Sequence, residues 1–193
     1  ATQKFMKEII EIGAVKLDSE LNQIDTFSEL IKPVVSKKLR SRIKTLTNIT
    51  NDDVKAGRPF EKVIEDFKEW IGEDAVVMSW GDTDIRTLLT NYKWFMKTDY
   101  LDFIGKYADI QRYCQCFINM ENVQQAGLSY AAQCLEIDPD SFPHHRALDD
   151  SLLSAECFKK VFDEDKLNEF IKICDYDFYA RLLFHPYVIK NKN

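Results

Sequence analysis

The sequence has no apolar run long enough to cross a membrane, and no basic stretch followed by an apolar one at its start. Neither a membrane-spanning helix nor a secretory signal is therefore predicted. The five cysteines are odd in number and lack the spacing of a disulfide framework, which favours reduced thiols and a cytoplasmic protein. Repeats, low-complexity stretches and an interdomain linker are also lacking. We therefore expect residues 1–193 to form one domain, with residues 165–193 as a C-terminal helical extension.

The chain also has no excess of positive charge. Its net charge is −6 and its pI is about 5.2, whereas a protein that holds DNA by non-specific attraction is usually basic. Tight non-specific DNA binding is therefore not expected. A nucleic-acid substrate remains compatible with this charge, because cations can be concentrated locally. Residues 31–51 form such a basic strip without any acid: Lys32, Lys37, Lys38, Arg40, Arg42 and Lys44. The strip either holds a phosphate backbone or is a solvated helix face.

The apolar pattern predicts a mixed α/β fold. Residues 8–17 are apolar on both alternations, which indicates an interior strand, and residues 23–32 form a second strand after a turn. The two strands are expected to make an antiparallel hairpin. Helical spacing after Pro59 predicts an amphipathic helix, and residues 75–80 form a buried strand. Further helices are expected at 36–45, from 84 to 92, at 127–137, 150–162 and 165–184, with a last strand at 105–113. This order predicts an α/β class, a mixed β-sheet flanked by helices in one domain.

A first acidic site follows the strand at 75–80, in the segment Trp80-Gly81-Asp82-Thr83-Asp84. Ligands gather at the carboxyl ends of strands in α/β sheets, so Asp84 is a candidate metal ligand. Asp82 is the alternative ligand at this site. Either aspartate could instead be an ordinary helix cap or first-turn acid, favoured there by the helix dipole.

A second site is the segment from His145 to Asp150, just before an amphipathic helix. Histidine titrates near neutral pH, which suits a base that takes a proton from water. Asp150, in the first turn of the helix, suits a hard divalent cation. His144 is an alternative base. The structural alternative is a surface histidine followed by an ordinary acidic helix start.

Both sites together favour a metal centre, because carboxylates brought together from distant segments repel one another unless a cation neutralises them. Mg²⁺ uses few protein carboxylates and fills its shell with waters and phosphate oxygens. Two ions about 4 Å apart can stabilise the attacking and leaving oxygens of a phosphodiester. We therefore expect two divalent ions, Mg²⁺ or Mn²⁺, and a water nucleophile activated by His145.

Three stretches carry a resemblance to a known family: EIIEIGAVKL at 8–17, SWGDTD at 79–84 and HRALDD at 145–150. In this order they resemble the DEDDh 3′→5′ exonucleases, which have an RNase H-like fold. Within that group the chain is most similar to the KapD-like and Eri-type branch. The spacer at 46–50, Leu-Thr-Asn-Ile-Thr, resembles the family's Leu-Thr-Gly-Ile-Thr.

The resemblance implies a metal-dependent exonuclease in which Asp84 and Asp150 are metal ligands and His145 is the general base. It also implies a single-stranded nucleic acid as partner, with RNA favoured over DNA, and no membrane. The candidate contacts for the terminal nucleotide are Leu46, Thr47, Ile49 and Trp80. For Trp80, packing in the core is the commoner role.

The chain departs from the family at its start. The family's first motif, Asp-x-Glu, lies on the strand before the one at 8–17, yet no acidic residue precedes Glu8. Asp18-Ser19-Glu20 has matching letters but lies in the turn after the strand, so we reject it. The chain begins at Ala1 rather than methionine, and we expect the missing strand to lie upstream.

The missing motif motivates a second hypothesis, a degenerate exonuclease fold that binds protein or nucleic acid. A third is the proofreading or maturation subunit of a larger assembly, for which no protein partner is identified.

Overall fold

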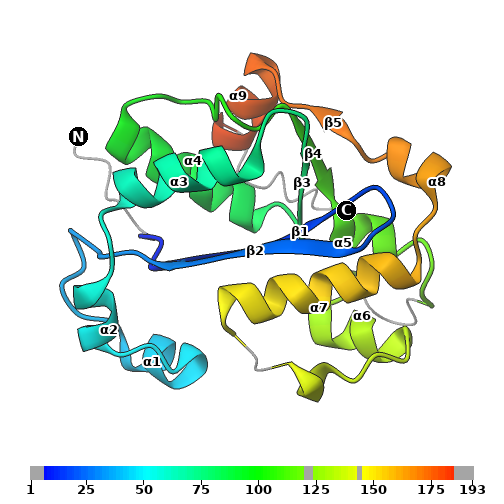
Figure 1. The fold of residues 1–193 in the computed structure, drawn as a ribbon, viewed down its shortest axis with the longest axis horizontal. Coiled ribbons are helices and arrows are strands. Elements are labelled where there is room, and N and C mark those ends of the chain that lie inside the picture. The colour runs from blue at the N-terminus through cyan, green and yellow to red at the C-terminus, as the bar shows by residue number, and fades with distance from the viewer. Residues whose placement is uncertain (1–6, 120–123, 143–144, 185–193) are drawn as a thin grey trace, which may run out of the picture.

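Two small β-sheets with helices around them make up the fold in the computed structural model, which describes residues 7–119, 124–142 and 145–184 (Figure 1). The strands are β1 (Glu11–Leu17), β2 (Gln23–Leu30), β3 (Val76–Ser79), β4 (Lys106–Asp109) and β5 (Lys172–Ile173). The longer helices are α3 (Phe60–Ile71), α4 (Thr83–Met96), α7 (Ala147–Lys160) and α9 (Tyr176–Phe184). The shorter ones are α1 (Ser41–Thr47), α2 (Asn51–Ala56), α5 (Ile110–Cys114), α6 (Leu128–Cys134), α8 (Glu164–Asn168) and the 3₁₀ turn Pro139–Ser141. None of the described helices is long and apolar enough to cross a membrane.

The first sheet is the predicted hairpin. β1 and β2 pair antiparallel, from Glu11 opposite Leu30 to Leu17 opposite Gln23. The turn between them is stabilised by the carboxylate of Asp18, which accepts backbone N–H groups of Glu20 at 2.9 Å and Asn22 at 2.8 Å. Such a side-chain-to-backbone turn explains why the chain reverses at this point.

The second sheet has the order β3-β4-β5. β3 and β4 are parallel, and β5 pairs antiparallel with the start of β4. Among the described residues β1 pairs with β2 alone and β3 with β4 alone. The outer edges of β1 and β3 therefore have no strand partner among the described residues, and a cavity described below lies between these two strands.

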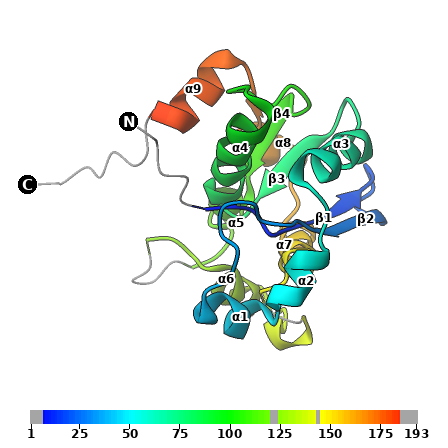
Figure 2. The same cartoon turned by 90° about the vertical axis from the view of Figure 1, so that its left-hand side faces the viewer.

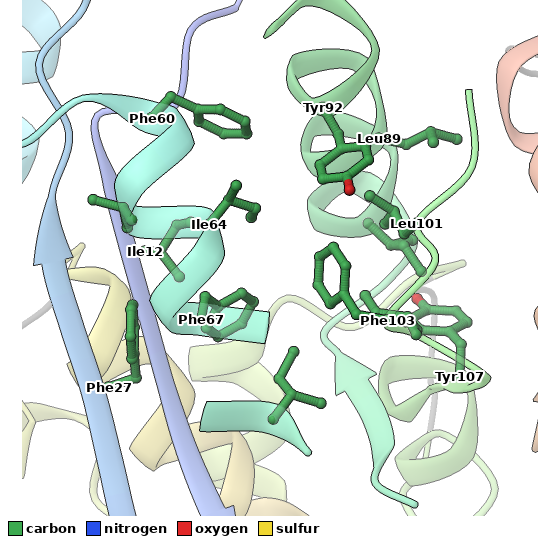
Figure 3. Close-up of a cluster of buried hydrophobic side chains, with 14 of the residues drawn as sticks. Ile12, Phe27, Phe60, Ile64, Phe67, Leu89, Tyr92, Leu101, Phe103 and Tyr107 are labelled. Atoms are coloured by element: carbon green, nitrogen blue, oxygen red, sulfur yellow. The ribbon is translucent and has the colours of Figure 1, made fainter. Parts of the chain in front are cut away.

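The larger hydrophobic core lies between the hairpin and α4, with α3 contributing one face to it (Figure 3). Ile12 of β1 and Phe27 of β2 meet the α3 residues Ile64 and Phe67 there, and the Phe27 and Phe67 rings lie 5.0 Å apart. Each fully buried side chain of this size contributes about 1.5–3 kcal/mol. The amphipathic helix predicted after Pro59 is therefore confirmed as α3.

Gly13 allows α7 to lie directly on β1. A Cβ atom at this position would be 2.1 Å from the backbone nitrogen of Leu148, a separation that no side chain can adopt. On its other side α7 buries Leu153, Cys157 and Phe158 in a second core with Tyr113. The close approach places the N-terminal turn of α7 beside the hairpin, which determines where its polar residues lie.

Three predicted elements are wrong in part. The helix expected at 36–45 is α1, which begins at Ser41 and ends at Thr47. The strand expected at 105–113 ends at Asp109, because the Asp109 carboxylate accepts the backbone N–H of Arg112 at 3.2 Å and begins α5. The segment at 165–184 is not helical throughout: Lys172 and Ile173 form β5. Phe178 and Tyr179 of α9 are buried in the larger core, so this segment packs into the domain.

Candidate active site

A cavity of about 1320 Å³ separates the two sheets. Its walls include the whole of β1 and β3. The N-terminal turns of α4 and α7 also reach it, and they contribute Asp84 and Asp150, with His145 from the turn before α7. The structure therefore brings all three candidate residues to one cavity, although Asp84 lies more than 60 residues before His145 and Asp150 in the sequence.

Asp84 and Asp150 influence each other electrostatically. Burial among surrounding protein atoms is the largest cause that raises the pKa of Asp84, and the negative charge of Asp150 is the second. The Asp84 side chain is nevertheless open to solvent, since it lies in a hollow rather than inside the core. A cation bound between the two carboxylates would remove their repulsion, and the cavity leaves room for it.

Asp82, the alternative ligand, has a structural role. Its carboxylate forms an ion pair with Arg86 one turn later in α4, with Nη2 and Oδ2 2.9 Å apart. Arg86 in turn donates to the backbone oxygen of Leu182 at 2.5 Å, which ties α4 to α9. The sequence left Asp82 and Asp84 as alternatives, and the structure directs Asp84 into the cavity.

The turn that carries Asp84 is held by buried polar contacts. Gly81 has a φ of 82°, a conformation that glycine adopts readily. Its carbonyl accepts hydrogen bonds from the hydroxyls of Tyr107 at 2.9 Å and Ser79 at 2.6 Å. The Trp80 indole lines the cavity and donates its N–H to the backbone oxygen of Ala126 at 3.0 Å. These bonds fix the direction in which α4 begins.

Glu11 fixes the start of α7, and sequence reasoning missed it by treating it as part of the strand. Its carboxylate accepts the Arg146 Nε at 2.9 Å and Nη2 at 2.6 Å, and the backbone N–H of Ala147 at 3.0 Å. The Glu11 side chain is 6% exposed and that of Arg146 39%. An acid inside an apolar strand was the available signal, because a buried charge requires a partner.

His145 lies on the turn just before Arg146 and the start of α7. It is exposed at the cavity and has a φ of 68°, which is uncommon for a residue other than glycine. Its backbone N–H donates to the carboxylate of Asp150 at 3.3 Å. The turn therefore holds histidine and aspartate next to each other. His144, the alternative base, falls outside the described residues.

The candidate nucleotide contacts are only partly at the cavity. Thr47, Ile49 and Trp80 line it, but Ile49 is 2% exposed and offers little surface. Leu46 is 42% exposed beside it and is not one of the residues that form its wall. Asn48 ends α1 with a φ of 56°, a left-handed conformation that glycine and asparagine tolerate best. This geometry accounts for asparagine where the resemblance has glycine.

Comparisons with known proteins place this chain in a family. A family model described as Exonuclease (RNase_T) matches residues 3–158 of the chain. The chain belongs to this exonuclease family. The assignment confirms the family that the three sequence stretches indicated.

Relatives and solved structures of exonucleases agree with it. The chain is 33% identical over 166 residues to the probable 3′-5′ exonuclease KapD of Bacillus subtilis, covering 85% of this chain and 77% of that protein. It is 30% identical over 194 residues to a PolC-type DNA polymerase III of Thermotoga petrophila, covering 96% of this chain but 13% of the polymerase. The crystal structure of the nuclease domain of 3′hExo, a DEDDh family member bound to rAMP, superposes with a TM-score of 0.69. That pair is 26% identical, and 80% of each chain is covered. The RNase H-like α/β fold is confirmed.

Exonucleases of the DEDDh group generally use divalent metal ions, and the residues present fit such an ion in part. Asp84 and Asp150 supply two carboxylates whose repulsion a cation would relieve. In the described ranges no three His, Cys, Asp or Glu side chains gather as a complete metal site. Mg²⁺ commonly binds one or two carboxylates and completes its shell with water and phosphate oxygens, so this pair fits part of the ligand set of a metal site.

Proposed function

We propose that this exonuclease removes nucleotides from the 3′ end of single-stranded nucleic acid, with RNA favoured over DNA. The observation that carries the proposal is the meeting of Asp84, Asp150 and His145 at one open cavity. The name of the relative KapD and the rAMP bound to the 3′hExo nuclease domain support the direction and the preference for RNA. The polymerase relative keeps DNA as the other substrate to be tested.

In the proposed mechanism His145 takes a proton from the attacking water. Its ring is exposed at the cavity, and the ion pair of Glu11 with Arg146 holds the turn that carries it. Asp84 and Asp150 would hold Mg²⁺ or Mn²⁺. When bound, two such ions would neutralise the carboxylates and stabilise negative charge on the attacking and leaving oxygens. Trp80 and Thr47 form walls of the cavity against which the terminal nucleotide would lie.

We also propose that a strand carrying Asp-x-Glu, placed before β1 in the protein, fills the cavity between β1 and β3. Both facing edges lack a strand partner in the described part, and buried backbone N–H and C=O groups are costly when they stay unpaired. A further strand would pair them. The β3 residues Val76, Val77 and Met78 are half-buried, although such an apolar strand is typical of a sheet interior. This strand would add two carboxylates to Asp84 and Asp150 and complete sites for two ions.

The test is digestion of a 5′-labelled single-stranded RNA oligonucleotide with Mn²⁺. A ladder of shortened products is expected, and it should disappear with EDTA or with Asp150→Ala. Asp149→Ala is the matched control, because it removes an acid from the same helical turn without changing the cavity. A 3′-phosphorylated RNA and a DNA of equal sequence test direction and sugar preference. A ladder that survives in Asp150→Ala would contradict the proposal.

The alternative is a binding module without hydrolysis. The open cavity and the two-carboxylate site are the observations that favour it. Repeating the digestion with the Asp-x-Glu strand added to the protein decides between them. RNA that is bound but not shortened, with equal affinity in the Asp150→Ala protein, would establish the module. A cytoplasmic location, inferred from the cysteines, also stays a proposal.

A further inference from the structure

The basic strip is a positively charged segment in a chain whose net charge is −6. It was defined above as Lys32, Lys37, Lys38, Arg40, Arg42 and Lys44. Without these six, the remaining 20 lysines and arginines face 32 acids. Several cations elsewhere form ion pairs with acids, as in Arg58 with Asp66 and Lys68 with Asp102. No member of the strip forms an ion pair with a described residue, and five of the six are exposed. The strip is therefore available to an anionic partner.

The backbone that carries the strip is anchored. The carboxylate of Glu8 accepts the consecutive backbone N–H groups of Val34, Val35 and Ser36 at 2.6 to 3.1 Å. Further along, the Leu39 N–H donates to the side-chain oxygen of Asn51 at 2.8 Å, which ties the segment to α2. α1 begins after this anchored segment, at Ser41. A segment ordered before binding loses less entropy when it binds.

The strip leads to the cavity. Its last two members, Arg42 and Lys44, lie in α1, and the last residue of this helix, Thr47, lines the same cavity as Asp84 and Asp150. A helix of this length spans about 10 Å. Both views show α1 and α2 beside the start of α7 (Figures 1 and 2). The hydrogen bond to Glu11 is the largest cause that raises the pKa of Arg146 there, and the charge of Asp53 in α2 is a smaller one. A strand whose 3′ end lies in the cavity would therefore meet the strip as it leaves.

We propose that the basic strip is a track for the phosphate backbone of a single-stranded nucleic acid, holding the nucleotides on the 5′ side of the end in the cavity. The inference rests on the proposed function. Contacts to phosphates position a strand without reading its sequence, so the track favours chain length rather than base identity. Binding should depend on salt, because each phosphate contact on a single strand changes the slope of log K against log salt by about −0.7.

Anisotropy of a 5′-fluorescein 20-nucleotide RNA in EDTA, at several salt concentrations, tests the track without cleavage. The strip variant is Lys37→Gln, Lys38→Gln and Arg42→Gln. The matched control is Lys106→Gln, Lys160→Gln and Lys172→Gln, which removes the same charge from exposed positions outside the strip and the cavity. We expect about tenfold weaker binding and a salt slope lower by about 2 for the strip variant, from the loss of three contacts. The control should bind within about twofold of the unaltered protein.

Four results would overturn the track. They are equal losses in both triple variants, no loss in either, no binding by the unaltered protein, and equally strong competition by polyglutamate, which would indicate a surface for acidic proteins. Cleavage separates this inference from the proposed function. The strip variant should lose activity on the 20-nucleotide RNA while keeping it on a dinucleotide, whereas Asp150→Ala loses both. If no protein cleaves but the strip variant alone loses binding, the track stands and the proposed activity fails.

Discussion

Two carboxylates near the N-terminus of α7 have opposite surroundings. Glu11 is almost completely buried and accepts three hydrogen bonds from Arg146 and Ala147. Asp84 is open to solvent and faces Asp150, whose charge together with burial raises the pKa of Asp84. The first carboxylate is neutralised by the protein and the second is not. The difference separates a buried acid paired with Arg146 from an exposed acid that we propose binds a cation.

The largest expected effect is on catalysis at the exposed side of this comparison. His145→Asn should lower kcat on RNA by about 10²- to 10⁴-fold, the usual contribution of a general base. Asparagine tolerates the left-handed backbone at this position, so the melting temperature should stay nearly unchanged. Single-turnover cleavage and thermal unfolding measure the two quantities. An unchanged kcat would remove His145 from the mechanism.

Glu11→Gln tests the neutralised side. Breaking a fully buried ion pair costs about 3–5 kcal/mol, and the partial exposure of Arg146 reduces this to about 2 kcal/mol. For a chain of this size the melting temperature should fall by about 4–8 °C. Activity should fall with it, because the turn that carries His145 is released.

Glu29→Gln is the control for Glu11→Gln. Glu29 forms an ion pair with Arg58 at 3.5 Å in which both side chains are more than one third exposed. Such a surface pair contributes about 0–1 kcal/mol. Equal losses of stability in the two variants would contradict a special role for Glu11.

Asp84→Asn tests whether the facing carboxylates await a cation. The pKa of Asp84 is raised in the folded state, so the folded protein becomes less stable as pH rises and this carboxyl ionises. In EDTA the variant should therefore be more stable than the unaltered protein at pH 7, with the difference disappearing in acid. Mn²⁺ should reverse the order, since tenfold excess over Kd contributes about 1.4 kcal/mol to the protein that binds it. Thermal unfolding at two pH values, with and without Mn²⁺, measures both effects.

Glu8→Gln should have the smallest effect. The change weakens charge-assisted bonds to three exposed backbone N–H groups, which together contribute about 1 kcal/mol or less. Stability should change little, while affinity for the 20-nucleotide RNA falls about two- to fivefold because the basic strip is less ordered. An affinity as low as that of the strip triple variant would mean that Glu8 acts on more than this segment.

Local patterns predicted most of the elements, and the exceptions have a common cause. The hairpin and the helix after Pro59 follow from apolar periodicity and turn residues within a few positions. β5 has two residues and forms because they lie beside Lys106 and Tyr107, more than 60 residues earlier. The end of β4 depends on the cap that Asp109 provides. Short elements of this kind are stabilised by tertiary neighbours rather than by propensity.

The sequence by itself determined which residues could do chemistry, because an aspartate after a strand and a histidine before an acidic helix are local patterns. The tertiary structure decided how they meet. It placed Asp84 in the cavity and paired Asp82 with Arg86. It also paired Glu11 with Arg146 across 135 positions, and left the edges of β1 and β3 without a strand partner in the described residues. The physical reason is distance. Propensity and turn chemistry act over a few residues, whereas charge pairing and strand pairing depend on positions in space that only the folded chain defines.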